Sequence, residues 1–348
     1  MKKTNEKQTA VVIAPGRGTY NKAELGYLAK HHPDFKHLEA FDSNRKAQEQ
    51  TPVSTLDQAE RFSGPTHTRG DNASPLIYAC GLADFSAISR ERFDIIGVTG
   101  NSMGWYTALA CAGALGPIEG FRTANTMGTL MQEHMIGGQL IYPFVDTDWC
   151  EIPGKRDELL ATVTHINALS DHTLGLSINL GGMLVLAGNE QGLHAFEASV
   201  PQIEQRFPLR LQNHAGFHTP LQEPVSKIGF QQLPLSLFQQ PELPIIDGRG
   251  GIWYPQASNL EALYNYTFGH QVTQTYDFTA ALETAAREFM PDVFIILGPG
   301  TTLGGASAQA LIQCNWRGWH SKKSMQNSSK SSPRLLSMGI EDHRTLCT

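Results

Sequence analysis

The feature that most constrains the fold is a series of short apolar runs, rich in β-branched residues, that each end at glycine or proline. Most of these runs are continuous and do not alternate with polar residues, which is typical of strands buried on both faces of a parallel sheet. Stretches of helical periodicity lie between them. The sequence therefore predicts an α/β fold with strands in the runs at 10–18, 93–102, 183–190, 243–251 and 292–300.

Three of these runs are followed by a glycine turn and then by small residues that could begin a helix. In open α/β sheets, ligands bind where the strands reach their carboxyl ends. We therefore expect the chemistry of this protein near Gly16, Ser102 and Gly298.

The patterning divides the chain into three parts. Residues 138–213 follow a β, α, β, α, β pattern over about 75 residues, which predicts a small subdomain inserted into a larger sheet. The flanking segments 8–137 and 214–315 would form a large α/β core. Residues 316–348 are rich in serine and lysine and are predicted to be a C-terminal tail, partly disordered.

Composition and charge exclude several classes of protein. The 348 residues carry 27 basic and 33 acidic side chains, a formal net charge of −6, so no basic field is expected to attract nucleic acid. No apolar run is long enough to span a membrane. The five cysteines, with no C-x-x-C pair, favour reduced thiols and a cytoplasmic location, and their spacing predicts no metal site.

Residues 100–104, Gly-Asn-Ser-Met-Gly, fit the G-x-S-x-G pattern, in which two glycines let a serine occupy a strained turn between a strand and a helix. The context agrees, because "FDIIGV" before the pattern predicts a strand and "WYTALACAGAL" after it predicts a helix. Ser102 is either a nucleophile on this turn or a small structural residue.

A serine nucleophile needs a base, and histidine is the usual one near neutral pH. Among 13 histidines, His218 is a candidate because it follows the predicted subdomain, where the chain would return to the large sheet. A structural or surface role for this histidine remains the alternative.

The chain resembles the malonyl-CoA:acyl-carrier-protein transacylases and the acyltransferase domains of fatty-acid and polyketide synthases. The resemblance covers about residues 10–312, and its motifs occur in the family's order. They are "APGRGTY" near the start, "GNSMG" at the serine, "TMGTLMQE" (126–133), "GFHTPLQEP" (216–224), "HQVTQTYDFTAALE" (270–283) and "LGPGTTLGG" (297–305).

This resemblance implies an α/β-hydrolase-like core with a parallel sheet and an inserted, ferredoxin-like α+β subdomain. It also implies that Ser102 is the nucleophile and His218 its general base, with the imidazole oriented by a backbone carbonyl in the segment of Gln271. The backbone N–H groups of Met103 and Arg17 would form the oxyanion hole. An acyl group would pass from acyl-CoA to Ser102 and then to the phosphopantetheine thiol of an acyl carrier protein, without a bound cofactor.

Several positions of the predicted substrate pocket depart from the family's pattern. Asn101 and Trp105 replace a histidine and an acidic residue, and Arg17 replaces a glutamine. Met127 stands where the family has the arginine that pairs with the malonyl carboxylate, and Asn179 is the clear polar residue left in "SINLGG".

These departures leave the acyl group open. A buried carboxylate needs a cationic partner, so methionine at position 127 favours an uncharged group such as acetyl over malonyl, unless Arg17 or Arg122 substitutes. Phe217 resembles the phenylalanine that narrows the pocket in many malonyl-using domains and predicts a small acyl group. Hydrolysis of carrier-protein thioesters and a non-catalytic scaffolding role in a synthase complex remain alternatives.

Overall fold

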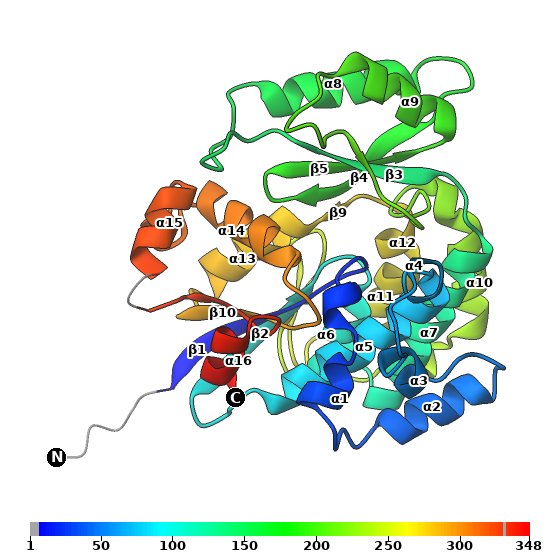
Figure 1. Cartoon of the computed structure of the whole chain (residues 1–348), viewed down its shortest axis with the longest axis vertical. Coiled ribbons are helices and arrows are strands. Elements are labelled where there is room, and N and C mark those ends of the chain that lie inside the picture. Colours follow the sequence, from blue (N-terminus) through cyan, green and yellow to red (C-terminus); the bar gives the residue numbers. More distant parts are fainter. Residues whose placement is uncertain (1–6, 330–331) are drawn as a thin grey trace.

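The computed structural model describes residues 7–329 and 332–348. Its larger sheet has six strands in the order β11-β10-β1-β2-β7-β8 (Figure 1). The first five run parallel and β8 is antiparallel to β7, which confirms the α/β class. The strands are β1 (Gln8–Ala14), β2 (Phe93–Gly100), β7 (Ile245–Ile246), β8 (Ile252–Trp253), β10 (Val293–Ile296) and β11 (Leu335–Ser337).

Helices cover both faces of this sheet, which is why its central strands are apolar throughout (Figure 1). One face carries α5 (Gly70–Ala87), α6 (Gly104–Cys111) and α16 (Glu341–Cys347), with α7 (Pro117–Glu133) packed on α5 and α6. The other face carries α13 (Phe278–Glu288) and α14 (Leu303–Gln313).

Shorter helices fill the connections. They are η1 (Lys22–Glu24), α1 (Tyr27–His31), α2 (Leu38–Lys46), α3 (Val53–Asp57), α4 (Gly64–His67), η2 (Pro220–Gln222), α10 (Glu223–Gln232), η3 (Leu235–Leu237), α11 (Leu260–Asn265), the π-helix η4 (Tyr266–His270), α12 (Gln271–Thr273), η5 (Trp316–Gly318) and α15 (Lys322–Ser329). None of the helices within residues 7–329 and 332–348 is long and apolar enough to cross a membrane.

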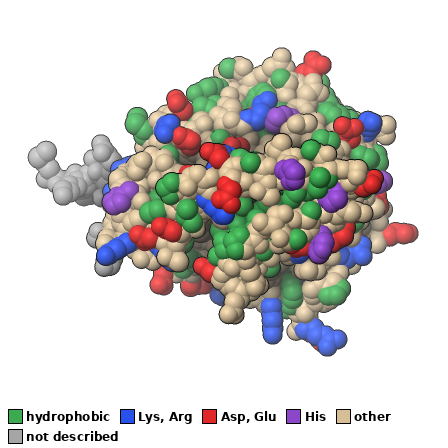
Figure 2. Space-filling view, turned by 90° about the horizontal axis from the view of Figure 1, so that it is seen from above, with side chains coloured by type: hydrophobic (Ala, Val, Ile, Leu, Met, Phe, Trp, Pro, Cys, Tyr) green, Lys and Arg blue, Asp and Glu red, His purple; other side chains and the backbone are tan. Residues whose placement is uncertain are grey.

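A second sheet has the order β6-β3-β5-β4-β9. Its first four strands are antiparallel neighbours, and β9 is parallel to β4. Helices α8 (Lys155–Asn167) and α9 (Glu190–Ser199) cover its outer face, where Figure 2 shows acidic, basic and apolar side chains interspersed. The strands are β3 (Gly138–Pro143), β4 (Leu174–Leu180), β5 (Met183–Gly188), β6 (Leu209–Arg210) and β9 (Tyr276–Asp277).

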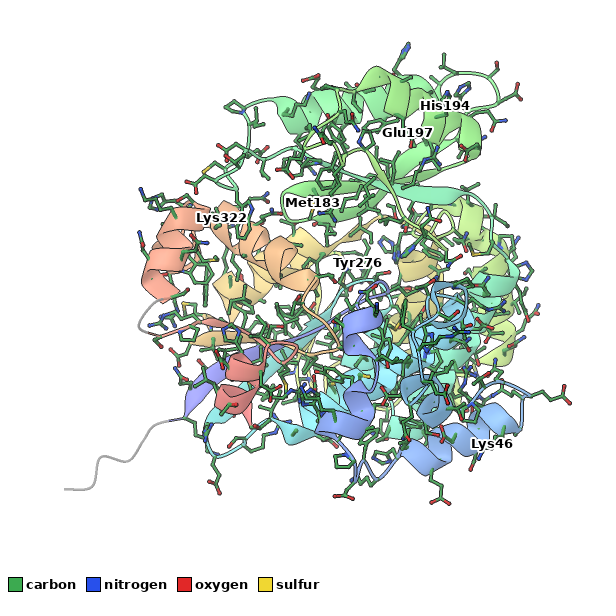
Figure 3. The ribbon with its side chains drawn as sticks, in the orientation of Figure 1. Lys46, Met183, His194, Glu197, Tyr276 and Lys322 are labelled. Atoms are coloured by element: carbon green, nitrogen blue, oxygen red, sulfur yellow. The ribbon has the colours of Figure 1, made fainter. Side chains whose placement is uncertain are left out.

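Tyr276 joins the two sheets. It belongs to β9 of the small sheet, and its buried hydroxyl donates a 2.5 Å hydrogen bond to the carbonyl oxygen of Gly100 at the end of β2. Figure 3 shows Tyr276 between the two sheets, below Met183 of β5. The carboxyl edge of the large sheet therefore faces the small sheet.

The run at 243–251 is longer than the strand that it forms, since only Ile245–Ile246 belongs to β7. Asp247 ends this strand because its carboxylate accepts hydrogen bonds from the backbone N–H groups of Arg249 (2.9 Å) and Gly251 (3.0 Å). These bonds close a turn that leads into β8.

The C-terminal segment 316–348 differs from the expected tail wherever the structure describes it, which is everywhere except residues 330 and 331. Leu335–Ser337 adds the edge strand β11 in parallel to β10. Trp316 and Trp319 are both buried, with ring centroids 4.9 Å apart. A strand this short leaves little signal among serines and lysines, which is why composition suggested a tail.

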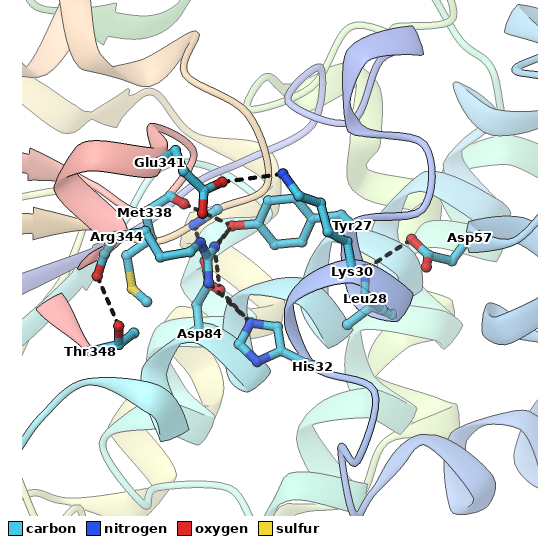
Figure 4. A network of polar contacts seen from close by, with 11 residues as sticks. Tyr27, Leu28, Lys30, His32, Asp57, Asp84, Met338, Glu341, Arg344 and Thr348 are labelled. Atoms are coloured by element: carbon cyan, nitrogen blue, oxygen red, sulfur yellow. Dashed lines mark hydrogen bonds and ion pairs between the residues drawn. The ribbon is translucent and has the colours of Figure 1, made fainter.

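A buried polar cluster ties this segment to the core (Figure 4). The carboxylate of Asp84, on α5, accepts hydrogen bonds from Tyr27 Oη (2.7 Å), Arg344 Nη2 (2.8 Å) and the backbone N–H of Gly298 (2.6 Å). His32 Nε2 lies 2.6 Å from the same carboxylate. Gly298 lies two residues after the end of β10, so the backbone of one of the three turns where chemistry was expected makes a structural contact.

Candidate active site

Ser102 stands on a tight turn between β2 and α6, with a φ of 54°. This left-handed conformation is strained for a residue with a side chain. The flanking glycines are required by close packing, because a Cβ on Gly100 would clash with the carbonyl of Gly104 and a Cβ on Gly104 would clash with the carbonyl of Ala14. The turn holds the serine between the ends of β1 and β2.

His218 contacts this serine although 116 positions separate them. Its Nε2 lies 2.7 Å from Ser102 Oγ, and its Nδ1 lies 2.5 Å from the carbonyl oxygen of Gln271. Because a carbonyl oxygen can only accept, Nδ1 carries the proton and Nε2 is the free acceptor for the serine hydroxyl. The structure therefore brings Ser102, His218 and Gln271 together.

The imidazole of His218 is held neutral by its surroundings. Burial is the main cause that lowers the pKa of His218 to about 4. The hydrogen bond to Gln271 raises this pKa and nearby His270 lowers it, both to a smaller degree. At neutral pH this side chain is therefore a base with an available lone pair.

Side chains of the small sheet position the loop of His218. Ser177 of β4 donates a 2.8 Å hydrogen bond to the carbonyl of Phe217, and Gln139 of β3 donates to Ser177 Oγ at 2.6 Å. Both polar side chains are buried. The small sheet thus holds the residue that precedes the histidine.

Gln271 has a second contact, which the sequence analysis did not find. Its side-chain Nε2 donates to the carbonyl oxygen of Ser102 at 3.0 Å, and Tyr106 Oη lies 3.4 Å from its Oε1. Gln271 therefore supports the histidine through its carbonyl and the serine turn through its amide.

Two other aromatic residues lie near the site, Trp105, which the sequence analysis named, and Tyr276, which it did not. The Tyr276 ring lies 5.4 Å from that of His218, while its hydroxyl binds the carbonyl of Gly100. Trp105 is fully buried, and its Nε1 donates to Thr267 Oγ1 (3.0 Å) in the π-helix just before Gln271. In the sequence, each appears as a single aromatic residue in or next to a motif. Trp105 directly follows Gly-Asn-Ser-Met-Gly, and Tyr276 lies in the stretch 270–283.

The backbone N–H groups of Met103 and Arg17 lie at the start of α6 and just after β1. Within the described part of the chain, neither donates a hydrogen bond to a protein acceptor. A Cβ built on Gly16, next to Arg17, would lie 3.4 Å from Ser102 Cβ, so the two segments are in contact at the serine. Free donors beside a serine are the arrangement that an oxyanion requires.

The side chain of Arg17 is held by hydrogen bonds through its Nη2 atom. Its Nη2 donates to the carbonyls of Thr68 (3.0 Å) and Asn213 (2.7 Å), and its guanidinium lies 5.3 Å from the ring centre of Phe217. Its Nε and Nη1 are buried and have no hydrogen-bond partner among the described residues.

The other predicted pocket residues are Met127, Asn179 and Asn101, and each has different neighbours. Met127 is fully buried, and its sulfur is 2.9 Å from where a Cβ on Gly229 of α10 would lie. Asn179 Nδ2 donates to Asp277 Oδ1 (3.1 Å), which also caps α13. Asn101 is buried with its Oδ1 unpaired within residues 7–329 and 332–348. No group of three metal-ligating side chains lies together in those residues.

No family model matches this chain. Among curated proteins, the phenolphthiocerol synthesis polyketide synthase type I Pks15/1 of Mycobacterium marinum is 25% identical over 309 residues. These residues are 87% of this chain but 14% of the synthase, so the chain spans a small part of that relative's length.

Two shorter curated relatives are malonyl CoA-acyl carrier protein transacylases. The protein of Salmonella typhimurium is 20% identical over 295 residues, covering 84% of this chain and 90% of its own length. The protein of Bacillus subtilis is 23% identical over 241 residues, covering 67% of this chain and 70% of its own length.

Solved structures show the same fold. The malonyl-CoA:ACP transacylase of Synechocystis has a TM-score of 0.72 at 17% identity, covering 97% of this chain and 99% of that chain. The malonyl CoA-acyl carrier protein transacylase of Coxiella burnetii has a TM-score of 0.74 at 16% identity, covering 98% and 97%. A type II polyketide synthase acyl-carrier protein in complex with its malonyl-transacylase matches with a TM-score of 0.70 at 18% identity, covering 88% and 93%.

Proposed function

We propose that this chain, which is related in sequence and in fold to the malonyl-CoA:acyl-carrier-protein transacylases, moves a small acyl group from coenzyme A to an acyl carrier protein. The observation that carries this proposal is the 2.7 Å contact between Ser102 Oγ and a neutral His218 Nε2 on a strained turn. A serine in contact with such a base is equipped for nucleophilic catalysis.

The first half-reaction transfers the acyl group to the serine. Ser102 Oγ attacks the thioester carbonyl of acyl-CoA while His218 Nε2 takes the hydroxyl proton. The N–H groups of Met103 and Arg17 bind the oxyanion of the tetrahedral intermediate. The intermediate collapses to the acyl-serine as the C–S bond breaks, and His218 returns its proton to the departing coenzyme A thiol.

The second half-reaction runs through the same groups in reverse. His218 removes the proton from the phosphopantetheine thiol of a carrier protein, whose sulfur attacks the acyl-serine ester. Collapse of the second intermediate releases the loaded carrier protein and returns the proton to Ser102 Oγ. The two steps form a ping-pong cycle in which each substrate uses one site in turn.

Gln271 is a positioning residue in this proposal. Its carbonyl oxygen fixes the proton of His218 on Nδ1, as the 2.5 Å contact supports, and stabilises the imidazolium that forms transiently. Its side-chain amide holds the carbonyl of Ser102 and so stabilises the strained turn.

The finer description of the fold is also an inference. Segments 8–137 and 214–315 would form an α/β-hydrolase-like core, and 138–213 a ferredoxin-like subdomain. The antiparallel order β6-β3-β5-β4, with α8 and α9 as the two crossovers, supports the second assignment. The cytoplasmic location expected from the cysteines stays a prediction.

Intact-mass measurement after incubation with a panel of acyl-CoAs tests the function. We expect the mass to rise by one acyl group, and Ser102→Ala to abolish the adduct. Ser199→Ala is the matched control, because Ser199 is exposed on the outer helix α9. Addition of a holo-carrier protein should then move the acyl group onto that protein.

The alternatives give different results in the same assay. Release of free acid without loading of the carrier protein would indicate a hydrolase. The absence of an adduct from every donor would contradict the proposal and favour a non-catalytic subunit.

A further inference from the structure

Trp105 connects the helix that follows the serine turn to the π-helix η4. It lies in the first turn of α6, three residues after Ser102, and its side chain is fully buried. Its indole Nε1 donates a 3.0 Å hydrogen bond to Thr267 Oγ1. Its ring meets that of Tyr266 edge-on, with ring centres 5.1 Å apart and an angle of 83° between the planes. Two adjacent residues of η4 are therefore held by one side chain of α6.

The hydroxyl of Thr267 needs a donor at position 105. Thr267 Oγ1 gives its own proton to the carbonyl oxygen of Leu263, which lies 2.8 Å away and about one helical turn earlier. The hydroxyl oxygen can therefore only accept a second hydrogen bond, and the indole N–H of Trp105 supplies it. An ionised carboxylate at position 105, which the resemblance implies, could not make this bond because it has no proton to donate.

The π-helix determines which way Gln271 faces. A π turn holds one more residue than an α turn, and such turns are rare and often occur at functional sites. Because successive residues of an α-helix lie about 100° apart around the axis, the extra residue rotates Gln271, directly after η4, by about that angle. Helix α12 ends at Thr273, so the carbonyl of Gln271 belongs to the last turn, whose carbonyls lack partners within the helix. It accepts instead from His218 Nδ1 at 2.5 Å.

Two hydrogen bonds join the serine turn and η4 side by side. Trp105 donates to Thr267, and Gln271 Nε2 donates to the carbonyl oxygen of Ser102, both at 3.0 Å. The bonded residues are three positions apart on one segment and four on the other, which is about one helical turn in each case. The carbonyl that orients His218 is thus fixed relative to Ser102 by two neighbouring contacts.

Other contacts hold η4 on its remaining sides. Ser226 Oγ, on α10, donates to the carbonyl of Phe268 at 2.6 Å, and Tyr266 Oη accepts from the backbone N–H of Gly248 at 2.8 Å. Neither contact involves the serine turn. A variant that loses only the bond from Trp105 should therefore still form the π-helix.

We propose that Trp105 and Thr267 are positioning residues for acyl transfer, which hold the π-helix so that the carbonyl of Gln271 meets Nδ1 of His218. The inference rests on the proposed function and adds two residues that act through Gln271. Without their hydrogen bond, the imidazole loses the acceptor that keeps its proton on Nδ1. Fewer molecules then have a free Nε2 beside Ser102.

Thr267→Val tests this proposal, because valine has nearly the same shape and lacks only the hydroxyl. Intact mass follows single-turnover acylation of Ser102 by malonyl-CoA and by acetyl-CoA. We expect the rate at saturating donor to fall about 10-fold, with the half-saturating concentration unchanged. Thr267→Ser, which keeps the hydroxyl, should restore the rate. Trp105→Phe should have the same effect as Thr267→Val, and combining the two should add no further loss.

The tautomer of His218 is a second readout that does not depend on any substrate. Nitrogen NMR of protein with isotope-labelled histidine should show the proton on Nδ1 in the unmodified protein and in Thr267→Ser. In Thr267→Val a fraction should move to Nε2.

Thr123→Val is the matched control. Thr123 is also fully buried in a helix, and its hydroxyl donates to the carbonyl oxygen of Glu119, four residues earlier, at 2.8 Å. Within the described part of the chain, no other group is hydrogen-bonded to this hydroxyl. The control should therefore leave the acylation rate and the tautomer of His218 unchanged.

A purely structural role of Thr267 would lower the thermal midpoint of Thr267→Val but leave its acylation rate per folded molecule and its His218 tautomer unchanged. That result would overturn the inference, as would equal losses of rate in Thr267→Val and Thr123→Val. Failure of the proposed function is distinguishable, because the unmodified protein itself would then form no adduct with either donor, and the inference would fall with the function.

Discussion

His218 combines two properties that a general base in this position requires. Its buried imidazole stays neutral over a wide pH range, and its tautomer is set by the carbonyl of Gln271. Its φ of 56° places it, like Ser102, in a strained backbone conformation. Two strained residues in contact are a feature of sites where geometry is imposed by the surrounding fold.

The pH dependence of acyl transfer follows from this residue. A lowered pKa keeps Nε2 unprotonated as the pH falls, so kcat/KM should stay level through pH 6.5 and decline only towards the pKa of about 4. A pH–rate profile of carrier-protein loading measures this. A decline centred near pH 6.5 would contradict it.

The same residue affects the stability of the fold. An unfolded chain binds a proton on His218 near pH 6.5, whereas the folded chain does so only near pH 4, so stability decreases as the pH falls below about 6.5. Far-UV circular dichroism at each pH therefore distinguishes protonation of His218 in the folded protein from unfolding of the protein.

At the scale of elements, the site depends on how closely β1, β2 and α6 approach one another. The N-terminus of α6 packs against the carbonyl of Ala14 at the end of β1, and this is possible only because residue 104 has no Cβ. The G-x-S-x-G pattern is therefore a packing requirement as well as a requirement of backbone conformation.

Gly104→Ala should destabilise the protein by about 2 kcal/mol or more, because the new methyl group overlaps backbone that cannot move freely. Gly305→Ala is the matched control. It lies in α14, where a Cβ meets open space, and should leave stability unchanged or raise it, since alanine favours a helix. Urea denaturation measures both, and equal effects would contradict the packing argument.

At the scale of the whole molecule, two buried connections hold the parts of the chain together. Tyr276 links the small sheet to the end of β2, and Asp84 links α5 to the C-terminal helix α16 and to the end of β10. Both connections end at the carboxyl edge of the large sheet. The edge that carries Ser102 is therefore held by segments that lie far apart in the sequence.

Asp84→Ala should destabilise the protein by about 3–5 kcal/mol, because it leaves the buried guanidinium of Arg344 without its carboxylate. The neighbouring pair of Lys30 with Glu341 also connects to α16, but both side chains are exposed (Figure 4). Lys30→Ala should leave the thermal midpoint unchanged within error. A comparable loss in both variants would contradict the role assigned to burial.

Local sequence was sufficient for the α/β class and for β1, β2 and β10, because each is a continuous apolar run. It was insufficient for β11, whose three residues follow a polar segment, and for the early end of β7 at Asp247. The contact between Ser102 and His218 was anticipated from the place of His218 after the predicted subdomain and from the resemblance, since no local pattern relates residues 116 positions apart.

The sequence by itself determined where β1, β2 and β10 form and which turn carries Ser102, because hydrophobic periodicity and glycine spacing act locally. Only the tertiary structure decided which polar groups meet there. It placed the carbonyl of Gln271 on His218, and it left two buried guanidinium nitrogens of Arg17 without a partner among the described residues. The physical reason is that desolvation and hydrogen-bond partners depend on what other segments bring to the same point, and residue order alone does not specify this.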